Sequence, residues 1–115
     1  METPVKTISR DELRSKLNRR EKFTLLETLA KNAYEHAHIP TAKNLPPDEL
    51  KTLAATLIPD KDAEIIVYCA SPTLHASENA ARELAAMGYT NIRDYAEGKQ
   101  DWLDAKLPIE SFHKH

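Results

Sequence analysis

The fold is decided by the stretch Glu64-Ile65-Ile66-Val67-Tyr68-Cys69-Ala70-Ser71-Pro72-Thr73-Leu74-His75-Ala76-Ser77, in which an apolar run ends at the chain's only cysteine. Residues 65–68 are typical of a strand at the centre of a parallel sheet, because such a strand is buried on both faces. A polar loop and a helical pattern follow. In open α/β sheets, reactive groups lie at the carboxyl ends of the strands. Cys69 therefore lies where a nucleophile is expected.

The helix after this loop favours the ionised form of the Cys69 thiol. A helix amino terminus carries partial positive charge and N–H donors, and the thiolate is the nucleophilic form of cysteine. A lone cysteine can also be no more than a small buried apolar residue. His75, the ionisable residue of the loop, either orients Cys69 or is a solvated residue of the first helical turn.

Strand and helix patterns alternate along the rest of the chain. Ser9 and Glu12 form a capping box that opens a helix, and Gly88 ends the helix that begins near Ser77. We expect strands at 5–8, 23–26, 42–45, 65–68 and 90–95, and helices at 9–17, 32–36, 48–57, 77–87 and 98–105. The sequence thus predicts an α/β fold, a small, open, mostly parallel five-stranded sheet with helices on both faces.

Length and composition predict one domain. The 115 residues, 41% hydrophobic and 30% charged, are ordinary for a globular protein. We expect the single domain to span 1–115, with its core at about 5–108 and a tail at 109–115. No stretch has the apolar length of a secretory signal or a membrane span, so we expect a cytoplasmic protein without membrane contacts.

Charge and cysteine content exclude several kinds of partner. A formal net charge of −2 provides no basic field for a nucleic-acid backbone. One cysteine cannot form an internal disulfide, and no ligand spacing typical of zinc occurs, so we predict neither metal nor cofactor.

Four segments carry family-like patterns in the same order. Tyr34–Ala42 is similar to Y-x-x-G-H-I-P-G-A, with Ala37 and Thr41 at the glycine positions, and residues 65–69 match a strand that leads into a catalytic cysteine. Residues 80–89 match A-A-x-x-L-x-x-x-G-Y, and residues 97–102 resemble G-G-x-x-x-W with Glu97 at the first glycine. Together these segments resemble the single-domain rhodaneses.

The resemblance implies sulfur transfer through a persulfide on Cys69, from a small sulfur donor or a protein persulfide to a thiol acceptor. A persulfide anion needs N–H donors, which the backbone of residues 70–76 would supply, Pro72 excepted. Glu27 and His38 are candidate supporting residues. The alternative for Glu27 is that it only fixes a neighbouring loop, and for His38 a structural role that bonds loop carbonyls is favoured over a catalytic one. The implied active-site loop consists of Ala70, Ser71, Thr73, Leu74, His75, Ala76 and Ser77.

The loop departs from the family pattern C-x-x-G-x-R/K. It has no glycine, and no Arg or Lys occurs between Lys61 and Arg82. The strand-end pattern D-x-R is replaced by Glu27-Thr28-Leu29. Thiosulfate reacts by expelling doubly charged sulfite, which a cation should stabilise. We therefore expect weak thiosulfate activity and favour a persulfide donor.

Two alternatives to sulfur transfer stay open. In the first, the chain is a non-catalytic rhodanese-like module that binds a partner or an anion. The second, a minor one, is phosphatase-like anion chemistry, since phosphatases of this fold use C-x-x-x-x-x-R. At the arginine position this chain has His75, and imidazole does not reproduce a bidentate arginine clamp. The oligomeric state is not indicated.

Overall fold

Parallel strands form the central sheet. The computed structural model describes residues 5–112, and its sheet has four strands in the spatial order β2-β1-β3-β4. Their bounds are β1 (Thr24–Glu27), β2 (Lys43–Asn44), β3 (Ile65–Tyr68) and β4 (Ile92–Tyr95). In the register, Tyr68 lies between Glu27 of β1 and Tyr95 of β4. The carboxyl ends of the three longer strands therefore meet at one edge, where Cys69 leaves the sheet.

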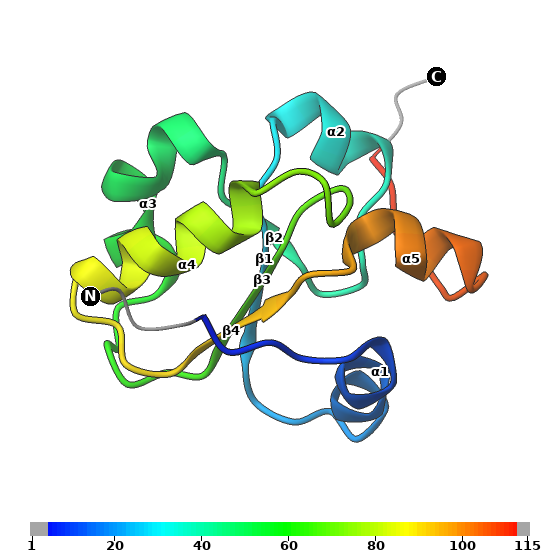
Figure 1. Ribbon diagram of the computed structural model, residues 1–115, viewed down its shortest axis with the longest axis horizontal. Helices are drawn as coiled ribbons and strands as arrows, with labels where there is room; N and C mark the ends of the chain where they lie inside the picture. Colours follow the sequence, from blue (N-terminus) through cyan, green and yellow to red (C-terminus); the bar gives the residue numbers. More distant parts are fainter. Residues whose placement is uncertain (1–4, 113–115) are drawn as a thin grey trace.

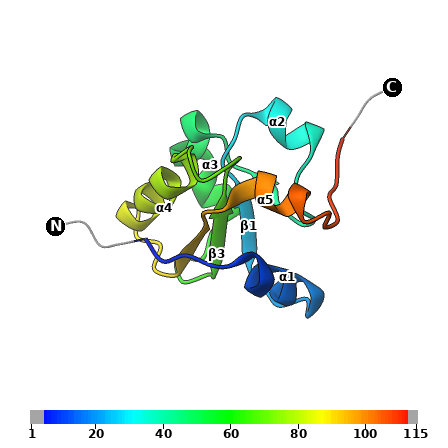
Figure 2. The same ribbon diagram turned by 45° about the vertical axis from the view of Figure 1, so that its right-hand side comes forward.

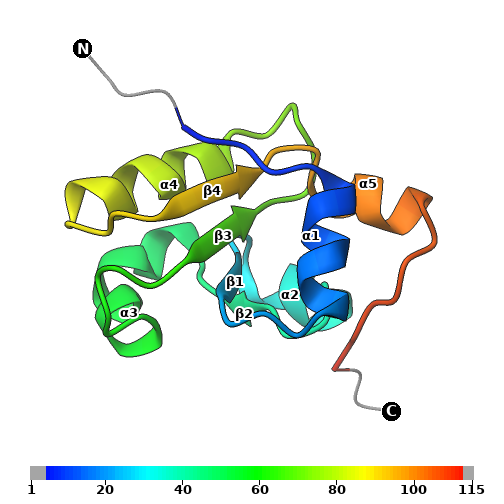
Figure 3. The same ribbon diagram turned by 90° about the horizontal axis from the view of Figure 1, so that it is seen from below.

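Helices cover both faces of the sheet, as expected (Figures 1 and 3). One face packs against α3 and α4, through a buried cluster that includes Leu26, Val67 and Leu84. The other packs against α1 and α5, through a cluster that includes Ile66 and Trp102. Figure 2 shows these two layers from another side. The helices are α1 (Arg10–Asn18), α2 (Lys31–His36), α3 (Leu50–Leu57), α4 (Ala76–Ala86) and α5 (Gly98–Asp104), with a 3₁₀ turn, η1 (Pro47–Glu49), before α3.

The expected count of five strands is wrong by one. Residues 5–8 do not form a full strand, because only Thr7 pairs with Asp94, in an isolated parallel bridge. The Asp94 N–H donates to the Lys6 carbonyl at 2.8 Å, and the Ile8 N–H donates to the Asp94 carbonyl at 3.1 Å. The chain enters α1 at Arg10 directly afterwards, so the paired segment is too short to form a strand.

The start of the expected tail at 109–115 is held in place. Glu110 and His38 exchange two backbone hydrogen bonds, both of 2.8 Å. The Phe112 N–H donates to the Glu35 carbonyl at 2.7 Å. Residues 113–115 of this tail lie outside the described residues. Over residues 5–112, no helix combines the length and the apolar character that crossing a bilayer requires.

Candidate active site

Cys69 follows the central strand, and its side chain points toward α4. Strand side chains alternate between faces. Tyr68 packs in the cluster beneath α1 and α5, so Cys69 takes the opposite face. Its Sγ lies 3.4 Å from the Oγ of Ser77, whose hydroxyl donates to the sulfur. Cys69 has no exposed surface. The start of α4 therefore closes over the thiol and presents it with one hydroxyl donor.

The backbone around the sulfur differs from the expected cradle of amides. Sγ lies 3.4 Å from the carbonyl oxygen of Leu74 and 3.6 Å from that of Ser71, so the S–H is the donor in both contacts. The Leu74 N–H is used within the loop, where it donates to the Ser71 carbonyl at 3.2 Å. A neutral thiol can donate its one proton to an oxygen acceptor, whereas a thiolate can only accept hydrogen bonds. In the described part of the chain, the backbone groups in contact with the sulfur are thus two carbonyl acceptors and not the expected N–H donors.

The start of α5 holds the origin of this loop. The Lys99 N–H donates to the Cys69 carbonyl at 2.8 Å, and the Gln100 N–H donates to the Ala70 carbonyl at 2.9 Å. The loop accordingly runs between the starts of α4 and α5 (Figure 1). The peptide groups that carry Cys69 are fixed by one helix while its side chain is covered by another.

The other expected loop residues lie toward the surface. Ser71 and Thr73 share a hydroxyl hydrogen bond of 3.0 Å, and Leu74 is 49% exposed. The His75 side chain is 69% exposed, and its Nδ1 lies 3.4 Å from Oε1 of Glu78. Among the side chains of this loop, only that of Ser77 hydrogen-bonds to the sulfur within the described part of the chain.

Glu27 and His38, the two candidate supporting residues, contact other groups than the sulfur. The fully buried Glu27 accepts a hydrogen bond from the Tyr68 hydroxyl at 2.8 Å and another from the Lys99 ammonium at 3.1 Å. Burial, followed by the charge of Glu27, raises the pKa of Tyr68 above its ordinary value. His38 Nδ1 lies 2.7 Å from the Tyr34 carbonyl oxygen. Glu27 thus links β1 to β3 and α5, and His38 contacts the end of α2.

The sequence interpretation missed two buried charged residues beside the site. Lys99 donates its ammonium to Glu27 and to the carbonyls of Ala33 and Ala37, at 3.1, 3.1 and 2.7 Å. Asp94, in β4, is 4% exposed. In Ile92-Arg93-Asp94-Tyr95, strand alternation puts Asp94 on the same face as the apolar Ile92, a signal from which its burial was predictable.

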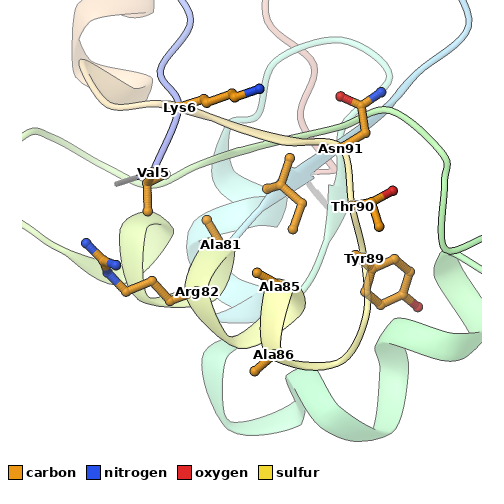
Figure 4. A pocket seen from close by; sticks show the side chains of 10 residues that line it. Val5, Lys6, Ala81, Arg82, Ala85, Ala86, Tyr89, Thr90 and Asn91 are labelled. Atoms are coloured by element: carbon orange, nitrogen blue, oxygen red, sulfur yellow. The ribbon is translucent and has the colours of Figure 1, made fainter. Parts of the chain in front are cut away.

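A groove of about 450 Å³ lies elsewhere, between α4 and the segment before α1 (Figure 4). Its lining includes Val5, Ala81, Ala85, Tyr89 and Ile92, and it contains none of the expected site residues. Across residues 5–112, no three His, Cys, Asp or Glu side chains gather as they would to hold a metal ion.

Comparison with known proteins gives one consistent result. A family model described as "Rhodanese-like domain" matches residues 9–105. The adenylyltransferase and sulfurtransferase UBA4 of Candida albicans is 31% identical over 82% of this chain and 23% of its own length. The thiosulfate sulfurtransferase PspE of Escherichia coli is 37% identical over 53% of this chain and 57% of its own length. The chain therefore spans less than two thirds of either relative.

The solved structures agree with the sequence comparison. The solution structure of the rhodanese-like domain of the Alr3790 protein from Anabaena superposes with a TM-score of 0.82 at 25% identity, covering 96% of this chain and 80% of that one. The parallel sheet and the helices on its two faces are shared with that domain.

Proposed function

The chain belongs to the family of rhodanese-like domains, and on this premise we propose that Cys69 accepts a sulfane sulfur from a persulfide and passes it to a thiol. The domain we assign to this activity has its core at 5–108. Two of the relatives, UBA4 and PspE, carry sulfurtransferase in their names, which supports the same class of reaction here.

The contact between Ser77 and Cys69 is the observation that carries the proposal. A hydroxyl in the first turn of α4 lies 3.4 Å from Sγ, at the carboxyl end of the central strand. Hydrogen bonds to a charged partner are stronger than those between neutral groups, so this donor favours the thiolate. The partial positive charge at the start of α4 acts in the same direction as this hydroxyl.

The transfer needs no external oxidant or reductant. In the first step, the Cys69 thiolate forms a bond to the outer sulfur of a donor R–S–SH, the donor S–S bond breaks, and R–S⁻ leaves. In the second step, an acceptor thiolate attacks the outer sulfur of the Cys69 persulfide, and Cys69 leaves as thiolate. Each step exchanges one S–S bond for another, so electrons and protons balance.

The charges around the loop favour persulfide over thiosulfate as donor. Thiosulfate leaves behind sulfite, which a nearby cation would stabilise. The backbone N–H of Lys99 contacts the Cys69 carbonyl, but the Lys99 ammonium is held by Glu27 and by the carbonyls of Ala33 and Ala37. A departing thiolate carries less charge and needs less help.

Intact-protein mass spectrometry tests the proposal. The purified protein is incubated with cysteine persulfide or with thiosulfate, and Cys69→Ser is treated in parallel. We expect the mass of one sulfur atom to be gained with cysteine persulfide, weakly with thiosulfate, and not in Cys69→Ser. The absence of any gain, or a gain that survives the substitution, would contradict the proposal.

A non-catalytic binding module is the second candidate, and the closed loop favours it. The sulfur has no exposed surface, and its backbone contacts are the carbonyls of Ser71 and Leu74. A persulfide donor reaches Sγ only after this loop moves. If alkylating reagents and persulfides both fail to reach Cys69 in the folded protein, the binding module is the better account.

A further inference from the structure

Asp94 is a buried acid on the same side of the sheet as Cys69. Asp94 lies in β4 and is 4% exposed. Its partner in the sheet is Val67 of β3, which precedes Cys69 by two residues. The Oδ1 atom of Asp94 accepts no hydrogen bond from any residue in the range 5–112, and no cation there forms an ion pair with its carboxylate. A buried carboxylate without a cationic partner projects its charge further than a solvated one.

Ser77 connects this carboxylate to the sulfur. The Ser77 side chain is buried, and its Oγ lies 3.4 Å from Sγ of Cys69. Burial raises the pKa of the Asp94 carboxyl above its ordinary value, while a hydrogen bond with Ser77 acts in the opposite direction. Ser77 therefore interacts with both the acid and the thiol, and its hydroxyl can donate its hydrogen to only one of them at a time.

The charged side chains near Asp94 do not neutralise its carboxylate. Glu78, the other acid acting on Asp94, is itself paired with Arg82 at 3.1 Å and lies 3.4 Å from His75. The Lys99 ammonium is held at Glu27, on the face of the sheet away from α4. Among residues 5–112, no cation is thus found paired with Asp94, the acid that interacts with the same serine as Sγ.

We infer that the Asp94 carboxylate selects the donors that react at Cys69 by their charge, because it repels anionic sulfur compounds and leaves neutral ones unaffected. This inference rests on the proposed function of Cys69. It goes further by assigning the selectivity to a named charge, rather than only to the missing loop cation. Replacing the carboxylate should therefore change reaction with anions more than reaction with neutral compounds.

Two alkylating reagents of similar size measure this field without any sulfur transfer. Iodoacetamide is neutral and iodoacetate is anionic, and both react with the same thiolate. The ratio of their rate constants at Cys69 is therefore independent of how much thiolate is present. We would measure this ratio by mass spectrometry at pH 8 for the parent, for Asp94→Asn, and for Glu83→Gln. The last variant makes the same charge change on the exposed side of α4.

In the parent we expect iodoacetamide to be strongly preferred. In Asp94→Asn the preference should fall by roughly fivefold, the size expected for one charge at close range in a partly solvated site. Glu83→Gln should leave the ratio unchanged. An equal ratio in parent and Asp94→Asn would overturn the inference, as would a failure of both reagents to reach Cys69.

A second test uses the parent alone and so does not depend on the folding of Asp94→Asn. As the pH falls and the Asp94 carboxyl takes up its proton, the preference for the neutral reagent should fade; a ratio that stays constant down to pH 4 would contradict the inference. The proposed function fails separately. If no persulfide forms on Cys69 but the preference for the neutral reagent is found, the proposed sulfurtransferase activity is contradicted. The effect of the Asp94 charge on the thiol is then still supported.

Discussion

Gly98 lies directly against the peptide group of Cys69. A Cβ added at Gly98 would come within 2.8 Å of the Cys69 carbonyl oxygen and 2.9 Å of the Ala70 carbonyl carbon. Gly98 also has a φ of +80°, in the region that side chains disfavour. The first turn of α5 can approach the loop this closely only because residue 98 has no side chain.

Gly98→Ala should therefore destabilise the protein by about 2–4 kcal/mol, since it adds a backbone overlap to an unfavourable φ. Chemical denaturation monitored by circular dichroism measures the change. Gly88→Ala is the matched control, because Gly88 has a φ of +99° but nothing within 4 Å of its added Cβ. The control should cost only about 1 kcal/mol. Equal losses in the two variants would show that the contact with Cys69 is unimportant for stability.

Asp94 should make stability depend on pH. Burial raises the pKa of its carboxyl in the folded protein, so the folded state holds this proton more tightly than the unfolded state does. Stability contributed by this group is present at low pH and is lost as the pH rises from the unfolded value through the raised one. As the pH rises from 3 to 7, the free energy of unfolding of Asp94→Asn should increase relative to that of the parent, as measured by urea denaturation. A difference that is constant with pH would contradict the burial effect.

Much of this arrangement was predictable from the sequence. The apolar run 65–68 and the helical spacing after Ser77 predicted β3 and α4 to within a residue at each end, because burial on both faces and a helical stripe leave strong patterns. The prediction of a fifth strand at 5–8 was wrong, because the single bridge at Thr7 does not extend to a ladder of paired residues.

The parts of the site that depend on tertiary contacts were not predictable. Lys99 reaches Glu27 across 72 positions of sequence, and no local pattern indicates that pair. The direction of the loop carbonyls also follows from the packing of α4 and α5 rather than from residue type. The expected cradle of amides therefore had to be replaced by the observed contacts of Ser71 and Leu74 with the thiol.

Ser77 and His75 should differ in their effect on the reactivity of Cys69. Ser77→Ala removes the hydroxyl that donates to Sγ, and we expect alkylation by iodoacetamide at pH 7 to slow by about three- to tenfold. His75→Ala should leave the rate within about twofold, since the imidazole is turned to Glu78 and solvent. A slower His75→Ala together with an unaffected Ser77→Ala would reverse the roles assigned to these residues.

A cation introduced into the loop should improve the reaction with thiosulfate. Leu74 is the fifth residue after Cys69, where the family pattern has Arg or Lys, and its side chain is 49% exposed. Leu74→Arg should raise the rate of Cys69 persulfide formation from thiosulfate by about tenfold, by stabilising the departing sulfite. Leu74→Gln controls for the loss of apolar surface. A gain that is equal in both variants would show that charge is not the cause.

The central claim is that Cys69 carries sulfur from one thiol to another. The direct test loads the protein with cysteine persulfide, removes the excess donor, adds an acceptor thiol, and follows the intact mass of the protein with time. We predict the gain of one sulfur atom on loading, its loss within minutes of adding the acceptor, and the recovery of persulfide on the acceptor. A protein that never gains the sulfur, or that keeps it in the presence of the acceptor, would contradict the account.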